Sequence, residues 1–152
     1  MKKQPLYLSC AETAKRLRTA LKEAFPAVQF TVRSKTYAGG ASIDVGWTDG
    51  PTAKQVQAVC NRFEGATFDG MTDCKGYQTH VVDGQPLHYG ADFIHAQRRL
   101  SVAFLTSVAQ TYCRRHRCPM PPILEQSIGG AYIPRSYVEE EEIMRLAWET
   151  SE

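Results

Sequence analysis

The first part of the chain combines helical and strand-like spacing of its apolar residues. Ser9 and Glu12 can form a capping box, in which a hydroxyl and a carboxylate accept hydrogen bonds from free amides at a helix start. Four apolar residues then recur on one helical face: Ala14, Leu17, Leu21 and Ala24. We therefore predict a helix that runs to about Phe25 and ends at Pro26.

An alternation of apolar and polar residues with a period of two follows this helix. The apolar positions of two successive strands are Val28, Phe30 and Val32, and then Ile43, Val45 and Trp47. The loop between them, from Tyr37 to Gly40, ends in two glycines that tolerate the backbone angles of a hairpin. The pattern predicts an antiparallel hairpin.

The middle of the chain predicts a second helix and a second hairpin. Thr52 and Gln55 offer another capping box, and apolar spacing continues the helix to about Phe63. Downstream, three segments have the composition of loops and strands: an irregular connection at 68–71, a strand at 77–82 and a strand at 86–94. Asp83–Gly84 is typical of the tight turn that joins two such strands.

The last third returns to helical patterns. Helical spacing covers 102–112, and the arginines that follow suit a helix C-terminus because they oppose its partial negative charge. Prolines in 118–122 exclude a continued helix, and 138–148 predict an amphipathic helix behind a run of glutamates. The predicted fold is α+β, a mostly antiparallel sheet with helices on one face, in the order αββαββα plus a C-terminal helix. We expect a compact domain over 1–117, and a proline-containing linker with the C-terminal helix over 118–152.

Composition narrows the class of protein. The chain has 152 residues, of which 43% are hydrophobic and 22% charged, as in a globular domain. No apolar run approaches the roughly 20 residues that span a bilayer, and the N-terminal segment lacks the apolar region of a signal peptide. Five cysteines without regular spacing indicate free thiols in a reducing compartment. We expect a cytoplasmic protein with no membrane partner.

Three segments carry a resemblance to a known family: VRSKTYAGGASIDVGWTDGPT at 32–52, FEGATFDGMTD at 63–73 and LHYGADFIHAQRRLS at 87–101. From roughly Cys10 to Ser101 the chain resembles the large polyvalent protein associated domain of the twenty-ninth type. The resemblance implies a protein of a phage, plasmid or conjugative element, and an expected role in protecting that element from restriction or CRISPR systems. It brings no catalytic residues to carry over.

Two groups of residues have side chains of the kinds that metal ions bind. They are the carboxylates of Asp44, Asp49, Asp69 and Asp73 and, separately, the side chains of Cys113, His116 and Cys118. Their spacing matches no known metal loop or zinc motif, and an aspartate beside a glycine is more often a turn former. We therefore assign no metal, no cofactor and no catalytic residue.

Cations gather at two places along the chain. Arg33 and Lys35 stand beside Tyr37 at the first hairpin loop, and arginines bracket the third predicted helix: Arg98, Arg99, Arg114, Arg115 and Arg117. Cations beside an aromatic ring suit phosphate contact and base stacking. The net charge of +2 is small, so a solvated basic face explains the same clusters. These residues are the candidate contacts for nucleic acid or another partner.

The leading hypothesis is a non-enzymatic phage or plasmid protein that binds a host defence complex or a nucleic-acid-processing complex, as an anti-CRISPR or anti-restriction inhibitor would. One alternative is a nucleic-acid-binding module, for DNA or RNA, without an inhibitor role. A second, with less support, is a metal-dependent enzyme that acts on nucleic acid through Asp69, Asp73 and one of His80, His88 or His95. A third is an accessory module whose partner domain belongs to another chain.

Overall fold

The computed structural model describes residues 4–125, 131–132 and 138–151. It confirms an α+β fold whose paired strands are mostly antiparallel. The chain forms two compact units: a first unit of Met1–Gly46 with Lys54–Gln97, and a second unit of Trp47–Ala53 with Arg98–Glu152. This grouping differs from the division expected at residues 117 and 118, because the third helix groups with the C-terminal helix. None of the described helices is both long and apolar enough to cross a membrane.

Helix α1 (Cys10–Ala24) begins at the predicted capping box. The Ser9 hydroxyl accepts from the Glu12 amide at 3.2 Å, and the Glu12 carboxylate accepts from the Ser9 amide at 2.8 Å. These reciprocal bonds satisfy two amides that have no partner inside the helix. Helix α2 (Ala53–Cys60) continues into a 3-10 turn (Asn61–Phe63). The prediction of a second helix that runs to about Phe63 is therefore confirmed.

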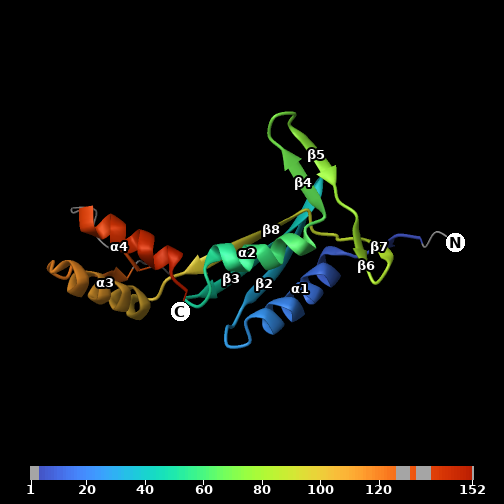
Figure 1. The fold of residues 1–152 in the computed structure, drawn as a ribbon. Coiled ribbons are helices and arrows are strands. Elements are labelled where there is room, and N and C mark those ends of the chain that lie inside the picture. The colour runs from blue at the N-terminus through green and yellow to red at the C-terminus, as the bar shows by residue number, and fades with distance from the viewer. Residues whose placement is uncertain (1–3, 126–130, 133–137, 152) are drawn as a thin grey trace. The chain divides into compact units, whose positions relative to one another are not determined.

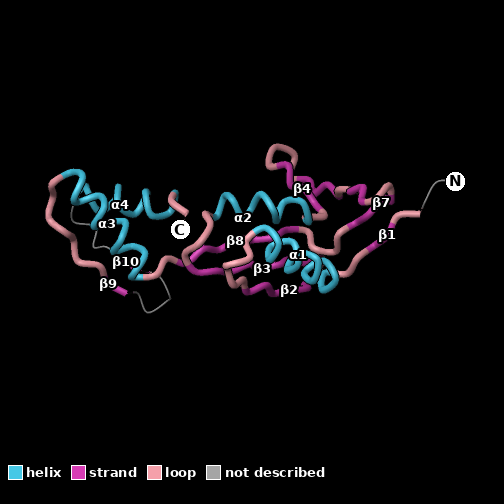
Figure 2. The backbone as a smooth tube through the Cα atoms, turned by 60° about the horizontal axis from the view of Figure 1, so that its bottom comes forward, coloured by secondary structure: helices cyan, strands magenta, loops and turns pink. Residues whose placement is uncertain are grey.

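The main sheet has the strand order β2-β3-β8, with β2 (Thr31–Tyr37), β3 (Gly40–Thr48) and β8 (Phe93–Arg99) (Figures 1 and 2). Strands β2 and β3 form the predicted antiparallel hairpin, with Thr31 opposite Gly46 and Tyr37 opposite Gly40. Buried and more exposed residues alternate along β3, which is the pattern of a strand with one covered face.

Helices α1 and α2 supply the cover for that face. Two side chains of α1, Leu17 and Leu21, are fully buried, and so is Val56 of α2. On β3, Ile43 is fully buried and Val45 is 1% exposed. Each such side chain contributes roughly 1.5–3 kcal/mol through burial. The Arg18 guanidinium also donates to the Val32 carbonyl at 2.7 Å and ties α1 to β2. The opposite face of the sheet is therefore the one available for contact.

Strand β2 starts three residues later than the predicted strand. The Val28 amide donates to the Phe25 carbonyl at 3.1 Å, and the Phe25 and Phe30 rings lie 6.0 Å apart. The apolar residues at 28 and 30 thus close the end of α1 instead of pairing in the sheet. The period-two pattern correctly predicted a strand, but Val28 and Phe30, its first two apolar residues, contact the end of α1.

The prediction of an irregular connection at 68–71 is wrong for Phe68 and Asp69, which belong to a strand, whereas Gly70 and Met71 lie in a turn. Strands β4 (Ala66–Asp69) and β5 (Cys74–Tyr77) pair as an antiparallel hairpin, which projects from the first unit in Figure 1. Its side chains are exposed on both faces apart from Ala66 and the half-buried Lys75, so no alternation of apolar and polar residues marks it. The turn composition was visible in the sequence, whereas the strands beside it were not.

A second small sheet has the order β1-β7-β6. Strands β6 (His80–Val82) and β7 (Gln85–His88) form a hairpin at the predicted Asp83–Gly84 turn, where both residues have positive φ, 51° and 72°. Strand β1 (Leu6–Tyr7) pairs with β7 in parallel. The predicted strand over 86–94 is thus divided between β7 and the start of β8.

The second unit packs helix α3 (Val102–His116) against helix α4 (Val138–Glu149). Both helices were predicted. Their shared core consists of apolar side chains and one tyrosine: Leu100, Leu105, Ala109, Tyr112, Cys113, Ile143 and Ala147. Short strands β9 (Leu124–Glu125) and β10 (Ala131–Tyr132) pair in the segment expected to be a linker.

One buried cation holds the second unit together. The Arg98 side chain donates to the carbonyls of Asp49 at 3.0 Å, Gly50 at 3.0 Å, Ala147 at 3.1 Å and Trp148 at 3.3 Å. Arg98 is only 5% exposed. The carbonyls of the last turn of a helix carry partial negative charge. The guanidinium therefore supplies hydrogen-bond donors both to the carbonyls at the end of α4 and to those of a turn that is distant in sequence.

We predict that Arg98→Met lowers the free energy of unfolding of the second unit by about 3 kcal/mol, because several buried carbonyls lose their charged donor. Both tryptophans, Trp47 and Trp148, belong to this unit, so urea unfolding followed by tryptophan fluorescence measures it. The exposed neighbour Arg99 is the matched control, and Arg99→Met should change stability by less than about 0.5 kcal/mol. Equal effects of the two substitutions would contradict this role of Arg98.

Candidate nucleic-acid interface

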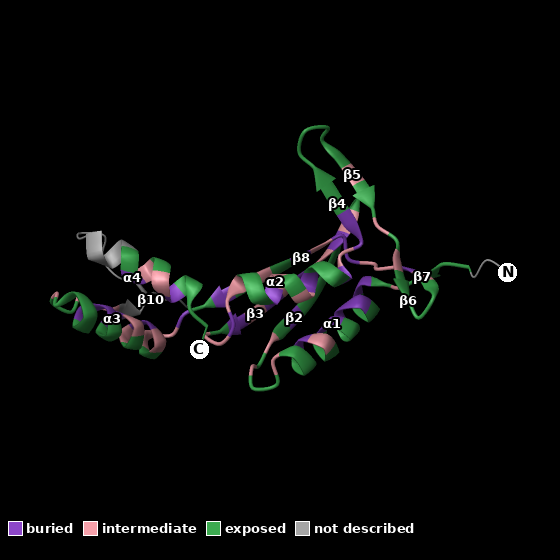
Figure 3. Ribbon diagram, viewed as in Figure 1, coloured by how far each residue is buried: buried purple, intermediate pink, exposed green. Residues whose placement is uncertain are grey.

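Strand β2 presents a row of two cations and an aromatic ring on the uncovered face of the main sheet. Arg33, Lys35 and Tyr37 are exposed, whereas Val32 is buried. Most of β2 has the colour of exposed residues in Figure 3. Side chains two residues apart on a strand point the same way and lie about 6.7 Å apart. The structure therefore brings these three predicted residues together on one face. We call Arg33, Lys35 and Tyr37 the β2 row.

The charge of the β2 row is partly balanced by one carboxylate. Lys35 Nζ lies 2.9 Å from Asp44 Oδ2, with the Lys35 and Asp44 side chains 66% and 31% exposed. Asp44 also stands opposite Arg33 in the β2–β3 register. Such an exposed pair contributes little to stability, at most about 1 kcal/mol. Its main consequence is electrostatic, because Asp44 reduces the attraction of both cations for a phosphate.

The β2–β3 turn is anchored at Asp92, just before β8. Asp92 Oδ2 accepts from the Ala41 amide at 3.1 Å and from Lys75 Nζ at 2.6 Å. Lys75 Nζ also donates to the Gly39 carbonyl at 3.3 Å. The hydrogen bond to Asp92 raises the pKa of Lys75 above its ordinary value. An ion pair between half-buried Lys75 and buried Asp92 thus joins the hairpin β4–β5, the turn after the β2 row and the entry to β8.

A cleft of about 470 Å³ opens beside this ion pair. Its lining is mostly aromatic rings, backbone and one carboxylate: Tyr7, Leu8, Gly65, Tyr77, His88, Tyr89, Gly90 and Asp92. The rings of Tyr7 and His88 are stacked at 4.7 Å with an interplanar angle of 12°. Tyr7 is 70% exposed and Tyr77 75% exposed, so both rings offer a free surface to a ligand.

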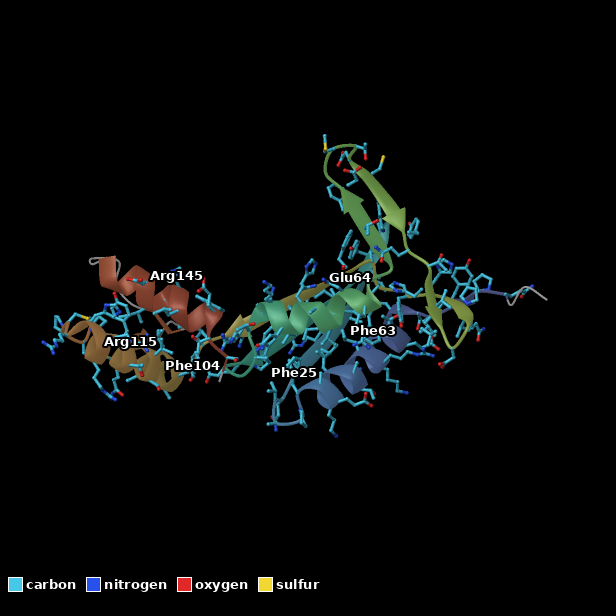
Figure 4. The ribbon with its side chains drawn as sticks, in the orientation of Figure 1. Phe25, Phe63, Glu64, Phe104, Arg115 and Arg145 are labelled. Carbon is cyan, nitrogen blue, oxygen red and sulfur yellow. The ribbon has the colours of Figure 1, made fainter. Side chains whose placement is uncertain are left out.

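Packing fixes the inner wall of the cleft. The Tyr89 ring lies 5.3 Å from the Phe63 ring and 4.9 Å from the His80 ring. The Glu64 side chain accepts from the Ile94 amide at 2.9 Å. Phe63 ends the 3-10 turn that continues α2, and Glu64 follows it directly (Figure 4). These contacts hold the wall in one geometry and leave the outer rings accessible.

Close backbone approach also shapes the cleft at Gly65. The Gly65 amide donates to the Ala91 carbonyl at 2.8 Å, and the Gly65 carbonyl accepts from the Gln78 amide at 2.8 Å. A Cβ atom at this position would overlap the Tyr89 carbonyl oxygen. Only glycine therefore lets the three chain segments meet here.

The second unit carries its own group of cations at the end of α3. Arg114, Arg115 and Arg117 are exposed, with Arg115 labelled in Figure 4. Arg117 has a left-handed backbone, φ 53°, and caps the helix, while the His116 ring stacks on Tyr112 at 4.2 Å. Arg99 is exposed as well. Arg98, by contrast, is buried against carbonyl oxygens and presents no surface to a phosphate.

Asp69 and Cys113, two of the residues considered as metal ligands, take part in other contacts. Asp69 accepts from the Met71 amide at 3.0 Å and from the Thr72 hydroxyl at 2.9 Å, and these hydrogen bonds lower the pKa of Asp69. Buried Cys113 lies 3.5 Å from the Pro119 carbonyl. Among the described residues, no three His, Cys, Asp or Glu side chains form a group that could hold a metal ion.

In the described part of the chain, no cysteine thiol is paired with a histidine ring as a nucleophile with its general base would be. Burial raises the pKa of the Cys60 thiol to about 12, so it stays protonated at neutral pH. His80 Nε2 lies 2.7 Å from the Glu64 carbonyl, and His88 Nδ1 lies 3.2 Å from the Gln78 carbonyl. His95 is exposed on β8. The two histidines near the cleft therefore contact backbone carbonyls.

Sequence reasoning missed the residues of the cleft. The lining residues Tyr7, Tyr77 and Asp92 come from three separate segments, Lys75 pairs with Asp92 from the same strand as Tyr77, and none of the four belongs to a motif. A single sequence does not reveal that Lys75 and Asp92 pair, because that contact depends on the hairpin β4–β5, which was itself missed.

Comparison with known proteins gives one finding. A family model described as large polyvalent protein associated domain 29 matches residues 8–101, which is more than half of the chain. The match contains the β2 row, Asp92 and most of the cleft lining, whereas Arg114, Arg115 and Arg117 lie outside it. No curated protein and no solved structure shows significant similarity to the chain.

We predict that Gly65→Ala destabilises the first unit by several kcal/mol, because the new methyl group must displace backbone at Tyr89. Gly70→Ala is the matched control, since a Cβ there meets no atom within 4 Å. That control should change the free energy of unfolding by less than about 0.5 kcal/mol. Far-UV circular dichroism during urea unfolding measures both. A Gly65→Ala protein as stable as the control would contradict the packing of the cleft.

The ion pair predicts an alkaline dependence of stability. The folded-state pKa of Lys75 lies above its ordinary value of 10.5, so the pair contributes fully below pH 10.5. Its contribution is lost as the pH rises through the raised folded-state pKa. The difference in Tm between the wild type and Lys75→Met should therefore be constant at neutral pH and disappear at strongly alkaline pH. A difference that does not change over this range would show that Lys75 acts through packing alone.

Proposed function

Because the chain belongs to the family of large polyvalent protein associated domain 29, we propose that it is a non-enzymatic binding protein that engages nucleic acid within a host defence or nucleic-acid-processing complex. Membership of this family associates the protein with phages and other mobile elements. An inhibitor of a CRISPR or restriction system would act in this way. Nucleic acid is the contact that the described surface supports best.

The observation that carries the proposal is the β2 row. Arg33 and Lys35 are cations on an open sheet face, and the exposed Tyr37 follows them at the same strand spacing. An open face of this kind contacts a single strand through phosphates at the cations and through stacking at the ring. The row lies within the segment that matches the family, so the proposal refers to the family domain itself.

The second unit adds a separate group of cations. Arg99, Arg114, Arg115 and Arg117 are exposed there, and each can neutralise a phosphate. The left-handed backbone of Arg117 favours glycine, so Arg117→Gly removes the charge without disturbing the helix cap. We propose these cations as a separate phosphate contact of the second unit that adds to affinity, and we exclude the buried Arg98.

A protein contact is the second candidate, and the hairpin β4–β5 favours it. Phe68 is 58% exposed and Met71 is 96% exposed, on a hairpin that also carries Asp69 and Asp73. Large apolar side chains left in solvent are characteristic of protein interaction sites, and the two carboxylates oppose contact with phosphate. In this version the hairpin contacts a protein of the complex, while the β2 row contacts its nucleic acid.

We predict opposite effects of two substitutions on the uncovered face. Arg33→Glu should weaken the binding of single-stranded DNA and RNA, whereas Asp44→Asn should strengthen it, because it frees Lys35 from its ion pair. Electrophoretic mobility shifts at several salt concentrations measure both. Removing one cation that binds a phosphate should reduce the slope of log K against log salt by about 0.7 for a single strand.

The sign of the Asp44 effect separates binding from folding. Substitutions that acted only by destabilising the sheet would weaken binding in both Arg33→Glu and Asp44→Asn. A direct role of the β2 row therefore requires that the two substitutions change the affinity in opposite directions. Arg33→Lys keeps the charge and should bind nearly as the wild type does. Absence of a shift with any nucleic acid at low salt would contradict the proposed function and favour the protein contact through Phe68 and Met71.

A further inference from the structure

We propose that the aromatic cleft of the first unit binds one unstacked nucleobase that carries an amino group. This inference rests on the proposed function, since it concerns the same strand of nucleic acid that contacts the β2 row. The volume of the cleft, about 470 Å³, falls within the range of roughly 300–1,000 Å³ that is usual for small-ligand sites. It is therefore large enough for a base but not for a folded partner.

Aromatic surfaces define what the cleft can take. The stacked pair of Tyr7 and His88 presents a flat surface, and the ring of Tyr77 forms another part of the lining. All bases have a planar face that stacks on such rings, with roughly 1–3 kcal/mol for each base. Because Tyr7 and Tyr77 are 70% and 75% exposed, the folded protein keeps these surfaces in water, where a ligand can cover them.

The cleft continues from the β2 row. An added Cβ atom at Gly40 would lie 3.1 Å from the Tyr37 ring and would overlap Asp92 Oδ2, so the last residue of the row is next to Asp92. Asp92 in turn lines the cleft and pairs with Lys75. A single strand whose phosphates meet Arg33 and Lys35 is thus led past Tyr37 to the cleft.

Asp92 provides selectivity among bases. Both of its hydrogen bonds use Oδ2, and no described residue donates to Oδ1. The side chain is 12% exposed and belongs to the lining, so a ligand can reach it. A carboxylate oxygen accepts from an exocyclic amino group such as that of cytosine, the pairing that acidic side chains make with this base. Thymine and uracil place a carbonyl oxygen on either side of their one ring N–H, and the carboxylate repels those oxygens.

Fluorescence anisotropy with labelled single-stranded oligo-dC and oligo-dT of equal length tests the proposal. Wild-type protein should bind oligo-dC at least about fivefold more tightly than oligo-dT. Tyr7→Ala and Tyr77→Ala should each weaken the binding of oligo-dC by roughly tenfold and reduce this preference. Tyr77→Phe keeps the ring and should bind as the wild type does. Val81→Ala, an exposed position outside the cleft lining, is the control.

Asp92→Asn gives an independent result. The asparagine keeps an acceptor for the Ala41 amide and adds an amide donor, so the preference should move from oligo-dC toward oligo-dT. If this variant does not fold, the two tyrosine variants still decide the proposal, because their side chains are exposed and their removal opens no core.

The failures of the two proposals are distinguishable. If wild-type protein binds neither oligonucleotide, the proposed function fails and the cleft proposal fails with it. If Arg33→Glu weakens binding, but oligo-dC and oligo-dT bind equally to the wild type and the tyrosine variants bind like Val81→Ala, the function stands and the cleft proposal is overturned. Loss of oligo-dC preference in both tyrosine variants, with Tyr77→Phe unchanged, supports the cleft as the site of a base.

Discussion

One carboxylate connects three separate segments of the first unit. Asp92 accepts from the Ala41 amide and from Lys75 Nζ, and it thereby joins β3, the hairpin β4–β5 and the entry to β8. A buried carboxylate is costly unless it is paired and hydrogen-bonded, and here the chain supplies both a cation and an amide. The same pairing places Lys75 and Tyr77 beside the turn that ends the β2 row. Structure and candidate site therefore share one residue, since Asp92 both anchors the turn after the row and lines the cleft.

The second unit uses the opposite charge for a similar purpose. The Arg98 guanidinium donates to carbonyls of a turn and of the end of α4, which are far apart in the sequence. Arginine suits this position because its planar group presents several donors in fixed directions. Its neighbour Arg99 has the same charge but remains on the surface. Two adjacent arginines thus divide into one that holds the fold and one that is available for contact, and only burial distinguishes them.

Local patterns predicted much of the fold, and distant contacts explain what they missed. The capping box at Ser9 and Glu12, the first hairpin, the Asp83–Gly84 turn and both C-terminal helices follow from short-range chemistry, and all are present. The hairpin β4–β5 was missed because its side chains are exposed on both faces and show no alternation. For the site, spacing alone placed Arg33, Lys35 and Tyr37 together. The cleft was not predictable, because Tyr7, Tyr77 and Asp92 come together only through tertiary contacts. The burial of Arg98 was not predictable either, because no local sequence pattern indicates it.

The central claim is that the β2 row of the first unit contacts single-stranded nucleic acid. Ultraviolet crosslinking of the wild-type protein to a single-stranded oligonucleotide, followed by mass spectrometry of the crosslinked peptides, tests it most directly. The account predicts crosslinks at Tyr37, next to the cations of the row, and at Tyr7 or Tyr77 of the cleft. Crosslinks confined to peptides of the second unit, or an absence of crosslinks at concentrations where the strand is bound, would contradict it.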